Sequence, residues 1–138
     1  MQHADHQETA PDSQTLVITR LVCSLRGAEQ VVHITPGSLT FKAYGRLEVT
    51  ERFSCNYGVN ENYRADIFGN DLRVVGQDEE GKVRIVERPS HPFFVATLFT
   101  PQLSSEPGRP HPLILAFLRA AALRAREGSV GQYPPSDA

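Results

Sequence analysis

Short apolar runs between residues 15 and 127 predict a mixed α/β domain. The β-branched runs at 15–22 and 30–35 predict two strands that pair with each other. Alternation of apolar and polar residues over 46–52 predicts a half-exposed strand. The nearly unbroken apolar run at 93–99 predicts a strand that is buried on both faces.

Two further elements are marked by turn and cap residues. Residues 72–77 and 82–87 flank an acidic turn that ends in Gly81, which predicts a β-hairpin because glycine adopts positive φ at little cost. Asn60 predicts the start of a short helix that ends near Gly69.

The last element is an amphipathic helix that begins at Pro112. Basic residues toward its C-terminal end favour the helix dipole. Apolar residues at i, i+3, i+4 and i+7 form a stripe that we expect to dock on the sheet: Ile114, Phe117, Leu118 and Ala121.

Polar segments flank this domain. Residues 1–14 lack an apolar stretch, and residues 128–138 are rich in Gly, Pro and Ser. Such segments bury too little apolar surface to offset the entropy of ordering. The sequence therefore predicts a disordered tail at 1–14, a domain at 15–127 and a second disordered tail at 128–138.

Composition excludes several classes of function. The chain has 138 residues and a formal net charge of −2, so it offers no basic face for nucleic acid. Its apolar runs are too short to span a bilayer. Two cysteines do not make a disulfide framework, which favours a reducing cytoplasm. We expect no cofactor and no metal site.

Three motifs, in order, resemble the CTP synthases. ERFSCNYGVN at 51–60 resembles their ERHRHRYEVN, and HPFFVATLFTPQ at 91–102 resembles their HPWFVACQFHPE. HPL at 111–113 is similar to the HPLF that opens the family's last helix. The resemblance covers about residues 20–122. It implies the C-terminal half of a flavodoxin-like class I glutamine amidotransferase domain, an α/β fold with a mixed sheet, a β-hairpin and a terminal helix.

The resemblance also implies glutamine hydrolysis, which supplies ammonia for CTP synthesis through a Cys-His-Glu triad. The family's His and Glu fall on Thr100 and Gln102, and Gly-x-Cys-x-Gly, the nucleophile elbow, occurs nowhere in the sequence. A threonine hydroxyl does not accept a proton as an imidazole with a pKa of about 6.5 does. We therefore expect a degenerate, N-terminally truncated relative that is not an enzyme, with Thr100 and Gln102 as relic positions.

Glutamine binding is also expected to be weak. The family's arginine that the resemblance implies contacts the glutamine carboxylate is Asn56 here, while the following Tyr57 is kept. Losing one charge-assisted hydrogen bond costs about 1.5–3 kcal/mol.

The cysteines and two of the histidines have simpler interpretations than catalysis. Cys55 lies mid-strand with no glycine elbow or basic partner, and Cys23 lies in an apolar run that predicts a core position. His91 and His111 each precede a proline at the start of an element, which indicates capping or loop roles.

Three roles stay open at the level of sequence. The chain is a silent binding or structural module, or a gene remnant. Alternatively, it completes a glutaminase whose nucleophile half lies on another chain, so that a partner or a second copy covers an exposed sheet edge. The third role is a small-molecule sensor that uses the relic cleft.

Overall fold

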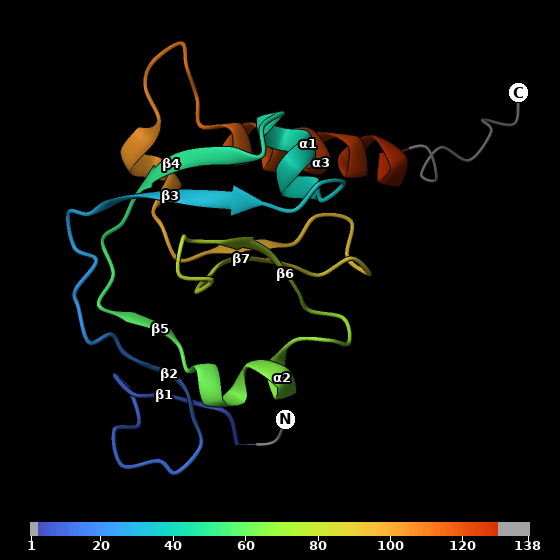
Figure 1. Cartoon of the computed structure of the whole chain (residues 1–138). Coiled ribbons are helices and arrows are strands. Elements are labelled where there is room, and N and C mark those ends of the chain that lie inside the picture. Colours follow the sequence, from blue (N-terminus) through green and yellow to red (C-terminus); the bar gives the residue numbers. More distant parts are fainter. Residues whose placement is uncertain (1–2, 130–138) are drawn as a thin grey trace, which may run out of the picture.

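The computed structural model describes residues 3–129, which form two sheets with helices at opposite ends (Figure 1). The three-stranded sheet has the order β1-β2-β5, and the five-stranded sheet has the order β4-β3-β6-β7-β8. The strands are β1 (Asp5–His6), β2 (Leu16–Arg20), β3 (Glu29–Ile34), β4 (Glu48–Arg52), β5 (Tyr57–Val59), β6 (Arg73–Gln77), β7 (Val83–Glu87) and β8 (Val95–Thr97). The helices are α1 (Leu39–Tyr44), α2 (Arg64–Ile67) and α3 (Pro112–Ser129), with 3-10 helices η1 (Glu61–Tyr63) and η2 (Pro101–Ser104).

The strand predicted at 15–22 is present as β2, but its predicted partner is wrong. β2 pairs antiparallel with β5 and parallel with β1, whereas β3 belongs to the other sheet. Two further hydrogen bonds join the ends of β2 to the residues that flank β5. The Leu21 N–H donates to the Asn56 carbonyl at 2.7 Å, and the Asn60 side-chain amide donates to the Leu16 carbonyl at 2.9 Å. These long-range contacts override the local hairpin pattern.

Residues 3–14 differ from the predicted disordered tail. The Asp5 N–H donates to the Thr15 carbonyl and the Gln7 N–H to the Ile18 carbonyl, both at 3.0 Å, which places β1 beside β2. The Ser13 hydroxyl also donates to Asp5 Oδ2 at 2.6 Å. Hydrogen bonds rather than apolar burial hold this segment. Of the predicted tail at 128–138, residues 130–138 lie outside the described residues, and α3 continues to Ser129.

The predicted hairpin is confirmed as β6 and β7. Gly81 closes the turn with φ of 76°, and Asp78 Oδ1 accepts from the Glu80 and Lys82 N–H groups. The helix predicted after Asn60 is also present, because the Asn60 side chain accepts from the Asn62 N–H at the start of η1. The buried apolar core is formed by side chains of β3, β6, β7 and α3 and of the loops that adjoin the strands: Leu25, Val32, Ile34, Phe53, Val75, Ile85, Phe99 and Leu113.

The predicted strand at 93–99 is shorter and more exposed than expected. Only Val95–Thr97 pair with β7, and β8 lies at the edge of the sheet. The Phe94 side chain is 39% exposed, whereas Phe99 is buried edge-on against Phe53. Phe94 and Ala96, which share one face of the strand, are both exposed, so the prediction of burial on both faces is wrong.

The terminal helix begins at Pro112 as predicted, but its apolar stripe is only partly covered. Leu113 is buried and α3 packs on α1 through its first turns. Beyond them α3 extends past α1 (Figure 1), which leaves Phe117 53% and Leu118 55% exposed. None of the described helices is long and apolar enough to cross a bilayer.

Candidate functional site

Thr100 and Gln102, the predicted relic positions, lie where β8 passes into η2. The Thr100 N–H donates to the Arg52 carbonyl at 3.0 Å, and the Thr100 carbonyl accepts from the Leu103 N–H at 3.0 Å. Gln102 is exposed. Within the described residues neither side chain has a hydrogen-bond partner. Both positions therefore contribute backbone contacts and no visible acid–base arrangement.

Asn56 and Tyr57 lie in the segment that enters β5, beside the chain that follows β2. Asn56 Oδ1 accepts from the Ser24 hydroxyl at 2.5 Å, so this oxygen is already engaged. Tyr57 pairs with Arg20 across the ladder, and its ring centroid lies 4.8 Å from that of His6. The retained tyrosine thus serves the packing of the N-terminal segment.

Neither thiol is hydrogen-bonded to an imidazole or a carboxylate in the described residues. Cys55 Sγ donates to the Tyr57 carbonyl at 3.1 Å and accepts from the Tyr57 N–H at 3.3 Å. Cys23 is exposed, so its predicted core position is wrong. It follows β2 on the exposed side of the chain, where its apolar neighbour Val22 is also fully exposed.

A buried cluster that sequence reasoning missed joins Tyr44, Glu51 and His111. The Tyr44 hydroxyl donates to Glu51 Oε1 at 2.5 Å, and His111 Nε2 lies 3.0 Å from the same oxygen. The exposed fractions of Glu51 and His111 are 3% and 2%. Glu51 Oε2 is buried without a hydrogen-bond partner.

The backbone of α3 fixes the tautomer of His111. The Leu113 N–H donates to His111 Nδ1 at 3.2 Å, so the neutral ring carries its proton on Nε2 and donates it to Glu51. The predicted capping role of His111 is confirmed, since this bond satisfies a free N–H in the first turn of α3. Burial, and then the hydrogen bond to Glu51, raises the pKa of the Tyr44 phenol far above its ordinary value.

This cluster has a signal in the sequence. Leu47, Val49, Glu51 and Phe53 share one parity along the strand, so Glu51 occupies the same face as apolar neighbours. The cluster borders a cavity of about 380 Å³ whose lining includes Arg46 and Arg109. It contains a histidine–acid pair but no thiol, so it is no hydrolytic triad.

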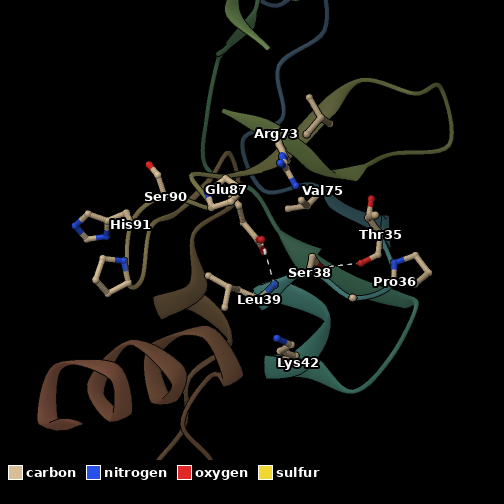
Figure 2. A pocket seen from close by; sticks show the side chains of 14 residues that line it. Thr35, Pro36, Ser38, Leu39, Lys42, Arg73, Val75, Glu87, Ser90 and His91 are labelled. Carbon is tan, nitrogen blue, oxygen red and sulfur yellow. Dashed lines mark hydrogen bonds between the residues drawn. The ribbon is translucent and has the colours of Figure 1, made fainter. Parts of the chain in front are cut away.

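A larger groove of about 730 Å³ lies between the start of α1, β6 and the loop after β7 (Figure 2). Its lining includes Lys42, Arg73, Glu87 and His91. None of the predicted relic positions lines it. Over residues 3–129, no group of three or more His, Cys, Asp or Glu side chains is placed to hold a metal ion.

Proteins with similar sequences include the CTP synthases of several bacteria. The CTP synthase of Rhodococcus jostii is 48% identical over 91 residues, which cover 64% of this chain and 15% of that protein. The CTP synthase of a Synechococcus strain is 36% identical over 136 residues, which cover 91% of this chain and 25% of that protein. The chain thus spans no more than about a quarter of these relatives. No protein-family model matches it.

Two solved structures have folds similar to that of this chain. The glutaminase domain of Trypanosoma brucei CTPS, with bound acivicin, matches with a TM-score of 0.79 and 28% identity over 86% of this chain and 50% of that chain. A Thermoplasma acidophilum protein assigned as a GMP synthase subunit matches with a TM-score of 0.59 and 16% identity over 80% of this chain and 51% of that chain, a likeness of fold alone.

Proposed function

This chain belongs to the CTP synthase family through an amidotransferase-like domain, and we propose that it is a catalytically silent member that serves as a binding or structural module. The α/β fold expected from the resemblance, that of a class I glutamine amidotransferase domain, is confirmed. Glutamine hydrolysis is the activity that the family relationship suggests. The residues of this chain support its lack of catalytic activity.

The observation that carries the proposal is the pair Thr100 and Gln102. Where the resemblance expects an imidazole and its carboxylate, the chain has a hydroxyl and a neutral amide. Neither group gains or loses a proton near neutral pH as an imidazole does. Losing such a pair from a Cys-His-acid mechanism lowers the rate by about 10⁴-fold or more.

The surroundings of Cys55 support the same conclusion. Its sulfur is engaged with the backbone of Tyr57. No basic side chain that would stabilise a thiolate is hydrogen-bonded to it in the described part of the chain. The buried pair of Glu51 and His111 instead bonds to Tyr44 and the first turn of α3.

A glutaminase assay tests the proposal. With excess glutamine, we expect ammonia release no faster than in a buffer blank, while the Rhodococcus jostii CTP synthase serves as the positive control. The variants Cys55→Ala and Thr100→Ala are measured in parallel. Ammonia release by the natural sequence that disappears in either variant would overturn the proposal.

We further infer that the chain works in the reducing cytoplasm. Both cysteines are unpaired, and Cys23 is exposed. An exposed free thiol is suited to a compartment in which thiols stay reduced. Labelling of Cys23 in intact cells by a thiol reagent, without prior reduction, is the expected result, and a blocked thiol would contradict the inference.

A second candidate function is the completion of a larger assembly by association. β8 is an edge strand, and the chain matches half of the trypanosomal glutaminase domain. On α3 three large apolar side chains are half or more exposed: Phe117, Leu118 and Leu123. Exposed apolar residues close to an open sheet edge favour a protein partner or a second copy.

Light scattering during size-exclusion chromatography tests this candidate. We expect a species larger than the 15.3 kDa monomer, alone or with a co-purified partner, that reverts to monomer in the variant Phe117→Ser with Leu118→Ser. The matched control is the variant Ala121→Ser with Ala122→Ser. A monodisperse monomer from cells of the source organism would rule the association out.

A further inference from the structure

The groove beside α1 is formed by three separate segments of the chain. Figure 2 shows the turn before α1, the strand β6 and the loop after β7 around it. Pro36, Pro89 and Pro92 lie in its walls, and proline restricts the backbone, so the groove is largely formed before a ligand arrives. A volume of about 730 Å³ is in the range of small-molecule sites.

Glu87, the acidic side chain in the lining, is already fully engaged. Its Oε1 accepts from the N–H and the hydroxyl of Thr40, both at 2.6 Å, and its Oε2 accepts from the Leu39 N–H at 3.1 Å. Glu87 is 4% exposed. Both of its oxygens are therefore hydrogen-bonded to the first turn of α1, which its negative charge stabilises.

The basic residues of the groove have no carboxylate partner among the described residues. Arg73 is directly opposite Glu87 in the β6–β7 ladder, yet Glu87 is turned toward α1 and no ion pair forms (Figure 2). Lys42, on α1, makes no ion pair or side-chain hydrogen bond there either. Elsewhere Arg64, Arg84 and Arg88 each bind a carboxylate.

His91 adds a neutral donor to this wall. Its Nδ1 accepts from the Phe93 N–H at 3.2 Å, so the neutral ring carries its proton on Nε2. The lining thus presents an ammonium, a guanidinium and an imidazole N–H. All three can donate hydrogen bonds to a ligand.

We propose that this groove binds a small organic oxyanion, a carboxylate or a phosphate ester. Lys42 and Arg73 supply charge and donors, His91 supplies a further donor, and the prolines contact the organic part. The site lies apart from Thr100 and Gln102, so its presence does not depend on whether the chain hydrolyses glutamine.

Titration calorimetry and thermal unfolding at constant ionic strength test the proposal, with inorganic phosphate and succinate as probes. At least one probe is expected to bind saturably and to raise the melting temperature, because a ligand of the folded state stabilises it. The probe that binds identifies the oxyanion chemistry. Neither probe binding would overturn the proposal.

Three variants that each remove one positive charge distinguish binding in the groove from non-specific attraction of an anion to the protein. Lys42→Gln and Arg73→Gln are each expected to weaken binding by about tenfold, the loss of one charge-assisted hydrogen bond. Arg119→Gln removes an exposed charge on α3, outside the groove, and is expected to leave binding unchanged. An equal loss of affinity in all three variants would also overturn the proposal, because it would show that only the net charge of the protein matters. Circular dichroism of each variant confirms that it is folded.

Discussion

His111 Nε2 lies 3.0 Å from Oε1 of Glu51, the same oxygen that the Tyr44 hydroxyl reaches at 2.5 Å. One buried carboxylate oxygen thus joins the end of α1, the strand β4 and the residue before α3. Since α3 is otherwise widely exposed, this cluster contributes to holding the terminal helix on the domain.

Replacing Glu51 with leucine is expected to destabilise the fold. The change removes the acceptor that the Tyr44 hydroxyl and the His111 Nε2–H share. The Tyr44 oxygen, 3.2 Å from His111 Nε2, can still accept from that ring, but the Tyr44 O–H is left buried without an acceptor, at a cost of about 1–3 kcal/mol. Urea unfolding followed by circular dichroism measures the loss. Glu51→Gln is the matched control, because it keeps one acceptor oxygen and should cost less. A Glu51→Leu variant as stable as the natural sequence would show that the cluster adds no stability.

His111 has a second contact that can be separated from the first. Its Nδ1 accepts from the Leu113 N–H at the start of α3, a role that asparagine also performs at helix N-termini. We expect His111→Asn to be more stable than His111→Ala by about 0.5–2 kcal/mol, the value of a helix cap. Chemical unfolding of the two variants makes the comparison. Equal stabilities would mean that only the Glu51 contact matters.

Local patterns in the sequence are sufficient for several elements and insufficient for their pairing. Gly81 and Asn60 mark the hairpin turn and the start of η1 correctly, because each acts through neighbouring residues. The local pattern predicts the wrong neighbour for β2, since its pairing with β5 joins residues about forty positions apart. It also predicts too much burial for β8, because the apolar residues of that strand do not reveal that nothing covers the face of Phe94 and Ala96.

The residues of the candidate sites also fall into those that the sequence identifies and those that only the structure shows. The substitutions at Thr100 and Gln102 can be read directly from aligned motifs. The contact between Glu51 and His111 spans 60 residues, and neither residue indicates the other in the sequence. Lys42 and Arg73 cannot be told from ordinary surface charges by sequence, and only the structure shows that Glu87 is turned away from them.

Asp71 gives stability a dependence on pH in the acid range. Its hydrogen bond from Ser90, and then its contact with Arg88, lower the pKa of its carboxyl in the folded state. A carboxyl with a lowered folded pKa contributes stability that is fully present above the unfolded pKa, about 3.9, and is lost as the pH falls through the folded pKa. Asp71→Asn is therefore expected to have a lower melting temperature near pH 6, and the difference should shrink as the pH falls below about 3.9. A difference that is constant across this range would contradict the assignment.

Gly76 is expected to tolerate no side chain, because β6 passes close to the buried Ile85. A Cβ at position 76 would lie 2.5 Å from Ile85 Cγ1 and 2.6 Å from its Cδ1, where the β6–β7 register shifts. Ile85 is fully buried and has nowhere to move, so Gly76→Ala should cost about 1–3 kcal/mol through overpacking.

A double-mutant cycle identifies the cause of that cost. Ile85→Val removes the Cδ1 atom, so Gly76→Ala should be less harmful in its presence, and the two changes should not add. Gly45→Ala is the control: its Cβ would meet open space, and its cost of about 1–2 kcal/mol would come from a φ of 66° alone. That cost should be the same with isoleucine or valine at position 85. If the cost of Gly76→Ala is also unchanged by Ile85→Val, the clash is not with Ile85 Cδ1 but with the Cγ1 and Cβ atoms that valine keeps.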